Sequence, residues 1–202
     1  MSEEQLVRGR DRSLAWLLLL GGAIGFTAAF VLVVEKIALI KDPSYVPSCS
    51  LNPVLSCGSI MTTDQAELFG FPNPLIGVAS FAILTTTGAA VLAGATVARW
   101  YWLGLQVGAL LGLAFVVWLI SQSLYVIGAL CPYCMVVWAV VVPVFLYVTL
   151  RNAAAGVFGD HVADSTAVRV AVEWHAAILV AAFGVVTLLI GVRFWSYWST
   201  LI

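Results

Sequence analysis

Two cysteines, Cys131 and Cys134, form a Cys-Pro-Tyr-Cys motif that is suited to redox chemistry. If a helix begins at this motif, Pro132 occupies its first turn, where the missing N–H costs nothing, and the two cysteines share one face. The positive end of a helix dipole lowers a thiol pKa and makes the thiolate more available for disulfide exchange. The motif therefore predicts a redox-active dithiol.

A second pair, Cys49 and Cys57, is separated by residues 50–56. Either pair could instead be a structural disulfide, although a ring as small as that of the Cys-Pro-Tyr-Cys motif removes little entropy from the unfolded chain. Met135, not His, follows Cys134, and this excludes the motif for c-type haem attachment. The residues alone leave open how the four cysteines pair, because four cysteines allow three connectivities.

The composition is that of an integral membrane protein. Hydrophobic residues make up 62% of the 202 residues and charged residues 9%, with a mean hydropathy of +1.06. Soluble domains carry roughly a quarter charged residues, so a soluble globular protein is excluded, as are a disordered chain and a nucleic-acid binder with a basic surface. The formal net charge is −1, so electrostatic information must lie in where the charges are placed.

Membrane-spanning helices need about 20 mostly apolar residues, and five segments meet that requirement. We expect a single all-α membrane domain over residues 1–202. Its first segment is longer than the apolar region of a signal peptide and is followed by no good cleavage site, so we expect it to be retained. The predicted spans are residues 14–40, 75–98, 102–130, 131–150 and 170–192.

The distribution of Lys and Arg predicts the orientation, because cytoplasmic loops carry the excess of these residues. An N-terminus inside the cell places six arginines on the cytoplasmic side and three basic residues outside. The C-terminus and all four cysteines then lie outside a cell (inner) membrane, in a compartment where disulfides form. That location disfavours a zinc site of four thiolates, and we expect no metal. The inner group is Arg8, Arg10, Arg12, Arg99, Arg151 and Arg169, and the outer group is Lys36, Lys41 and Arg193.

Residues 41–74 form the one long loop, and loops of this length are usually functional or disordered. The loop is too apolar to stay solvated, so we expect a lid packed over the outer end of the helices. Asp64 and Glu67 resemble a capping box that opens a short helix. Glu35 and Lys36, just before the loop, are either interfacial anchors or part of a proton path.

Taken together, these cysteines and their surroundings resemble the vitamin K epoxide reductase family, specifically its bacterial homologues. The likeness extends over residues 14–150. It rests on Cys49, on Ser56-Cys57-Gly58, on Asn73-Pro74-Leu75-Ile76-Gly77 at the start of the second span, and on Cys131-Pro-Tyr-Cys134.

The resemblance implies a four-helix bundle around a quinone, with a fifth transmembrane helix packed outside it. Cys49 and Cys57 would be the shuttle pair, and Cys131 and Cys134 the quinone-proximal pair. Bacterial relatives oxidise a thioredoxin-fold protein and pass two electrons to a membrane quinone, here menaquinone or ubiquinone. Only about ten residues follow Val192, so we expect the DsbA-like thioredoxin-fold partner to be a separate protein on the outer face.

The resemblance also implies three contacts to the quinone. Asn73 matches the family's hydrogen-bond donor to the quinone carbonyl, and Thr63 lies where the family has a supporting hydroxyl residue. The animal enzymes have a Tyr at the position of Trp138, and an indole ring there can stack or donate its N–H. Because the indole is bulkier, this substitution bears on whether an epoxide is a substrate.

The favoured function is therefore a membrane thiol-disulfide oxidoreductase that supports disulfide bond formation. One alternative is a quinone or vitamin K epoxide reductase that uses thiols as its electron source. Another is a non-enzymatic membrane scaffold in which two structural disulfides brace the outer loop. The four-helix oxidase DsbB performs the favoured reaction but places its cysteines differently.

Overall fold

The computed structural model describes the backbone of residues 3–200 and the side chains of residues 11–200. Arg8 and Arg10 are two of the arginines that predict the orientation, and their side chains lie outside the described residues. Within that part of the chain, helices and their connections make up the fold, joined by one isolated β-bridge. The long helices are α1 (Glu3–Lys41), α3 (Pro74–Leu92), α4 (Arg99–Ser121), α5 (Pro132–Ala154) and α8 (His175–Arg193).

These five helices are long and apolar enough to cross a membrane, which confirms a multi-pass, all-helical protein. At 1.5 Å per residue, a helix of about 20 residues matches the hydrocarbon core, where every backbone N–H and C=O must be paired within its own segment. The shorter elements are α2 (Cys57–Met61), the 3-10 helix η1 (Asp64–Glu67), the π-helix η2 (Gln122–Ile127), α6 (Asp160–Ala163), α7 (Thr166–Glu173) and α9 (Trp195–Trp198).

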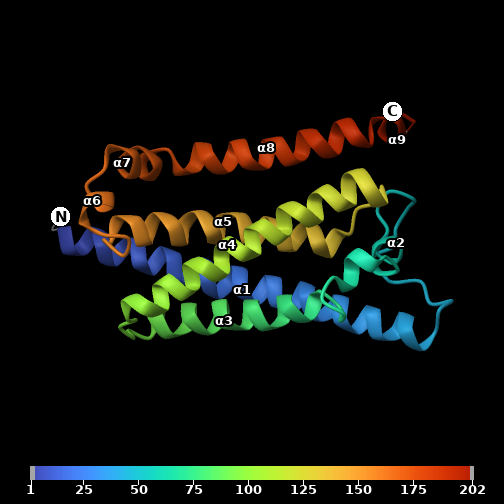
Figure 1. Cartoon of the computed structure of the whole chain (residues 1–202), viewed down its shortest axis with the longest axis horizontal. Coiled ribbons are helices and arrows are strands. Elements are labelled where there is room, and N and C mark those ends of the chain that lie inside the picture. The colour runs from blue at the N-terminus through green and yellow to red at the C-terminus, as the bar shows by residue number, and fades with distance from the viewer. Residues whose placement is uncertain (1–2, 201–202) are drawn as a thin grey trace.

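The bundle is organised around α1, which packs along both α3 and α5, while α4 packs along α5. Figure 1 shows α4 rising away from α3 toward the end of the bundle that carries α2. Helix α8 lies along the outside of the bundle and has no buried residue, as expected for a helix that faces lipid. Helices α1, α3, α4 and α5 thus form the packed part of the structure, with α8 along its outside.

Glycine allows the closest approach between α1 and α3. A Cβ atom added to Gly88 would lie 2.5 Å from the backbone nitrogen of Leu19 and 2.6 Å from the carbonyl oxygen of Ala15. Without a side chain, the two helix backbones meet directly, which is how small residues stabilise helix pairs in membranes. This contact holds the two helices together near the end opposite the cysteines.

Two predicted span boundaries were wrong at the connection between the second and third helices. The second helix ends at Leu92, not 98, and the third begins at Arg99, not 102. The chain turns away from the helix at Gly94, whose φ is +91°, and residues 95–98 have no regular secondary structure. The sequence did not reveal this boundary because the connecting residues are apolar, and hydropathy does not distinguish a helix from an apolar connection.

The other boundaries also moved. The predicted 102–130 span loses α-helical geometry after Ser121 and continues as η2 to Ile127, before a left-handed Gly128. The fifth span begins at His175 because Trp174 interrupts the helix and leaves α7 as a separate amphipathic helix. The first helix extends from Glu3 to Lys41 instead of 14–40, and the fourth from Pro132 to Ala154 instead of 131–150.

The loop after α1 forms a lid that contains α2 and η1, and side chains of α1 anchor it. Glu35 is buried and accepts hydrogen bonds from the backbone N–H and the hydroxyl of Ser48. The predicted short helix at Asp64 is present, but the capping box is wrong. Thr63 is the N-cap residue, and both acidic residues of the predicted box lie inside the helix.

Candidate active site

A single β-bridge aligns the two cysteine pairs. Leu55 pairs with Leu130 in parallel orientation: Ser56 N–H donates to the Leu130 carbonyl at 2.8 Å, and Leu130 N–H donates to the Val54 carbonyl at 2.7 Å. Each bridge residue is followed closely by a cysteine: Cys57 follows Leu55, and Cys131 follows Leu130. The bridge therefore places these two cysteines side by side.

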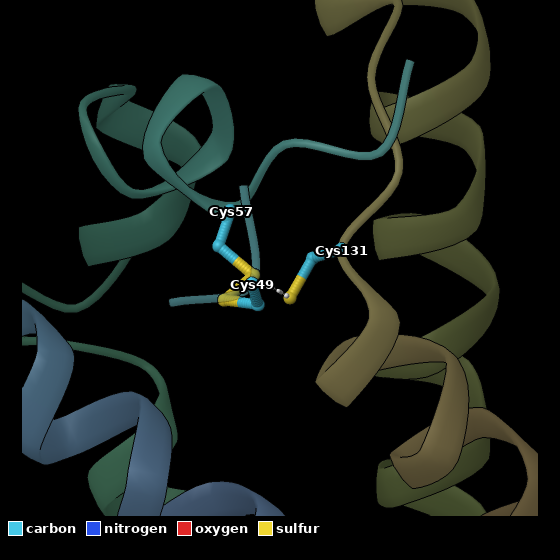
Figure 2. Close-up of side chains that lie close together, drawn as sticks. All are labelled: Cys49, Cys57 and Cys131. Atoms are coloured by element: carbon cyan, nitrogen blue, oxygen red, sulfur yellow. Dashed lines mark hydrogen bonds between the residues drawn. A yellow bond between two sulfur atoms is a disulfide. The ribbon is translucent and has the colours of Figure 1, made fainter. Parts of the chain in front are cut away.

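Cys57 Sγ and Cys131 Sγ lie 3.2 Å apart. A disulfide joins Cys49 to Cys57, while Cys131 and Cys134 are free thiols. Figure 2 shows the Cys131 side chain pointing from the start of α5 toward the disulfide, which belongs to the lid. Disulfide exchange proceeds by attack of a thiolate on a disulfide sulfur, and this arrangement brings an attacking and an attacked sulfur into contact.

Cys131 is the N-cap residue of α5, with Pro132 in the first turn as predicted. Its sulfur accepts a hydrogen bond from the backbone N–H of Cys134 at 3.3 Å. The neighbouring Cys134 thiol and the backbone N–H groups of Tyr133 and Cys134 lower the pKa of Cys131, against the opposing effect of burial. Cys131 is therefore the better thiolate to exchange with the lid disulfide.

The sulfur atoms of Cys49, Cys57 and Cys131 all lie within 4.8 Å of one another. Metal ions in such sites bind thiolates. Because Cys49 and Cys57 are joined to each other, only Cys131 offers a thiolate in this cluster. The chemistry that fits three clustered sulfurs in this state is exchange of the disulfide.

A cavity of about 880 Å³ lies beneath the lid and between α1, α3, α4 and α5. Cys57, Cys131 and Cys134 all line it, so both cysteine pairs face the same space. Most other lining side chains are apolar or aromatic, as in sites that bind a hydrophobic cofactor. The cavity reaches from the cysteines deep into the membrane-spanning part of the bundle.

A model of the vitamin K epoxide reductase family matches residues 16–149, a range that includes all four cysteines, the whole of α3 and α4 and most of α1 and α5. The chain belongs to the vitamin K epoxide reductase family. Membership makes the protein an oxidoreductase of a family that uses quinones. Comparison with curated proteins gives no match. Helix α8 lies outside the segment that matches the vitamin K epoxide reductase family.

Asn73 and Trp138 line the cavity beneath the lid, and their contact with a quinone stays a prediction. The Asn73 amide also holds the lid, because Nδ2 donates to the Gln65 carbonyl at 2.7 Å and Oδ1 accepts from Leu68 N–H. One amide N–H of Asn73 is left for a ligand, since Nδ2 carries two.

Thr63 does not lie in the cavity wall. Its hydroxyl donates to the Ile60 carbonyl at 2.7 Å, so Thr63 closes the turn between α2 and η1. Any effect of this hydroxyl on the site is exerted through the lid backbone.

Sequence reasoning missed several polar residues of the cavity. Gln65 comes from the lid, and Gln122 and Ser123 come from the start of η2. A π-helical turn often marks a functional site, but it has no simple sequence signature. Lys36, raised above as an anchor or part of a proton path, also lines the cavity.

Proposed function

We propose that this protein is a quinone-dependent thiol oxidase that supports disulfide bond formation outside the cell membrane. Electrons from a thioredoxin-fold, DsbA-like partner would pass through Cys49 and Cys57, then through Cys131 and Cys134, to menaquinone or ubiquinone. The observation that carries the proposal is the 3.2 Å contact between the Cys57 and Cys131 sulfurs, with Cys57 in a disulfide and Cys131 a thiol.

Electron entry would begin when a partner thiolate attacks Cys49 and Cys57 leaves as a thiolate. The second partner thiol then attacks the mixed disulfide, which releases the oxidised partner and leaves Cys49 and Cys57 reduced. Cys49 is only 5% exposed. Partner docking must therefore shift the lid segment that covers this sulfur.

Transfer between the pairs would follow along the sulfur contact. Cys57 attacks Cys131 of an oxidised Cys131–Cys134 disulfide, and Cys134 leaves as a thiolate. Attack of Cys49 on Cys57 then restores the lid disulfide and leaves Cys131 and Cys134 reduced. The arrangement of one lid disulfide beside two thiols is the product of this step.

The cavity residues fit a quinone. Trp138 Nε1 is the one buried side-chain polar atom without a partner among the described residues, and an indole N–H can only donate. Together with the free N–H of Asn73, it offers a donor to a carbonyl oxygen. These donors would hold and polarise a carbonyl in a dry site. A bound quinone supplies the terminal two-electron acceptor.

The proposed orientation has the N-terminus in the cytoplasm and the cysteines outside. Arg99 and Arg151 lie at the end of the bundle opposite the lid, where Arg99 donates to the Val157 carbonyl and Arg151 pairs with Asp11. Clustering of arginine at one end is the pattern of a cytoplasmic face. Cysteine labelling of intact cells with a membrane-impermeant reagent tests this orientation.

Anaerobic oxidation of a reduced thioredoxin-fold protein by the purified protein tests the function. We expect oxidation that requires added quinone and is abolished by Cys134→Ala. Cys49→Ala is the matched control: it should lose oxidation of the protein partner but keep quinone reduction driven by a small dithiol, which can reduce Cys131 and Cys134 directly.

The same assay separates the alternative functions. Turnover of a quinone epoxide faster than turnover of the partner would favour the epoxide reductase. The absence of turnover with menaquinone and ubiquinone, together with a loss of stability in Cys49→Ala and Cys57→Ala, would favour the scaffold and contradict the oxidase.

A further inference from the structure

Lys36 is the one formally charged residue among the described residues that line the cavity. It lies near the outer end of α1, and its side chain is only 12% exposed. A buried ammonium is costly in a membrane protein, and ionisable groups inside a membrane span usually serve a function. Cys57 and Asn73 line the same cavity, and the residue whose carbonyl the Lys36 ammonium contacts, Met61, is buried in one cluster with Cys57.

Two contacts fix the Lys36 ammonium. Its Nζ donates to the Met61 carbonyl at 2.6 Å and pairs with Glu67 Oε1 at 2.9 Å. An ammonium has three N–H bonds, so one is left for the cavity. The Glu67 side chain is 40% exposed, which connects the buried ammonium through one carboxylate to water outside the lid.

The chemistry of the second cysteine pair leaves a proton unaccounted for. Cys131 Sγ accepts the N–H of Cys134 at 3.3 Å, a contact that favours ionisation of Cys131 over Cys134, so we treat the reduced pair as reacting in the form of one thiolate and one thiol. Closing their disulfide releases two electrons and one proton, from Cys134. Reducing a quinone to a quinol takes up two electrons and two protons. One proton in each turnover must therefore come from another group.

We propose that Lys36 donates this second proton to the quinone oxygen and regains it from outside water through Glu67. The proposal rests on the proposed function, since it needs a quinone as the electron acceptor. In the balanced step, the Cys131–Cys134 bond forms, its two electrons reduce the quinone, and one proton comes from Cys134 and one from Lys36. Glu67 then passes a proton from water to the neutral amine.

Lys36→Arg tests proton donation separately from charge. A guanidinium keeps the charge and the pairing with Glu67 but cannot be deprotonated in a protein. The matched control is Lys41→Arg, because Lys41 is the only other lysine and is exposed. Fully reduced protein is mixed anaerobically with a soluble ubiquinone analogue, and quinone absorbance is followed during a single turnover in H₂O and in D₂O.

We expect Lys36→Arg to slow quinone reduction by about 100-fold, the usual contribution of a positioned proton donor. Reduction of the Cys49–Cys57 disulfide by dithiothreitol should keep its wild-type rate in this variant, because that step needs no proton from Lys36. The wild type should react more slowly in D₂O. Quinone reduction by Lys36→Arg at the wild-type rate would overturn the proposal while leaving the oxidase function intact.

A second measurement needs no turnover. The oxidised protein is acetylated with acetic anhydride with and without the same quinone analogue, and each lysine is quantified by mass spectrometry. We expect bound quinone to protect Lys36 and leave Lys41 unchanged. Equal acetylation of Lys36 with and without the quinone analogue would overturn the proposed role of Lys36 as proton donor. Failure of the wild type to reduce any quinone would instead overturn the proposed function itself.

Discussion

Cys57 and Cys131 are 74 positions apart in the chain, and their sulfur atoms lie 3.2 Å from each other. The bridge between Leu55 and Leu130 lies just before these two cysteines in the chain and aligns the segments that carry them. Backbone hydrogen bonds are strongly directional, so they set the register of the two cysteines more sharply than apolar packing would.

The sulfur contact predicts a disulfide that can be trapped. In the double variant Cys49→Ala/Cys134→Ala, the two remaining thiols, Cys57 and Cys131, should form a disulfide on mild oxidation. Peptide mapping without reductant measures it. The double variant Cys57→Ala/Cys131→Ala leaves one cysteine from each pair and should stay reduced under the same conditions. Equal bridging in both variants would contradict the specific contact.

Glu35 should control access to the lid disulfide. Its carboxylate accepts hydrogen bonds from the backbone N–H and hydroxyl of Ser48, the residue before Cys49. Glu35→Ala should destabilise the fold by about 1–3 kcal/mol, the cost of losing hydrogen bonds to a charged group. It should also speed reduction of Cys49–Cys57 by a phosphine, measured by alkylation and mass spectrometry. The exposed Glu173, changed to Ala, serves as the control and should alter neither quantity.

Trp138→Phe should separate ligand binding from stability. The variant removes the unpaired Nε1–H, so quinone binding should weaken by about 1 kcal/mol, roughly fivefold. Thermal stability should stay the same or rise, because a buried donor without a partner is lost. Calorimetric titration and thermal unfolding measure the two effects. Trp195→Phe, at a side chain 64% exposed, should change neither. Unchanged quinone affinity in Trp138→Phe would exclude this hydrogen bond.

Gly88→Ala should separate α1 from α3. The added Cβ would press on backbone atoms of Leu19 and Ala15, which cannot move independently of the helix. Overpacking of this kind costs about 1–3 kcal/mol, measured by thermal unfolding in detergent. Gly184→Ala on α8 meets no atom within 4 Å and should leave stability unchanged. A Gly88→Ala protein as stable as the wild type would contradict the close helix contact.

The sequence by itself determined the features that depend on local chemistry. Hydropathy identified five spans because a membrane helix must be apolar over its whole length. Pro132 after Cys131 identified the start of α5, because proline favours the first turn of a helix. The spacing of the cysteines and their flanking residues also identified the family.

Only the tertiary structure decided which distant residues meet. The bridge at Leu55 and Leu130 has no sequence signature, because its hydrogen bonds join backbone atoms that every residue carries. The sequence offers Lys36 as an interfacial anchor or as part of a proton path, whereas the contacts of its ammonium with Met61 and Glu67 arise only once the lid folds over it. Thr63 matched a family position, yet its hydroxyl closes a turn outside the cavity wall. These outcomes depend on how the lid packs. Lid packing is the sum of contacts between segments that are distant in the sequence, and a local sequence pattern does not encode such contacts.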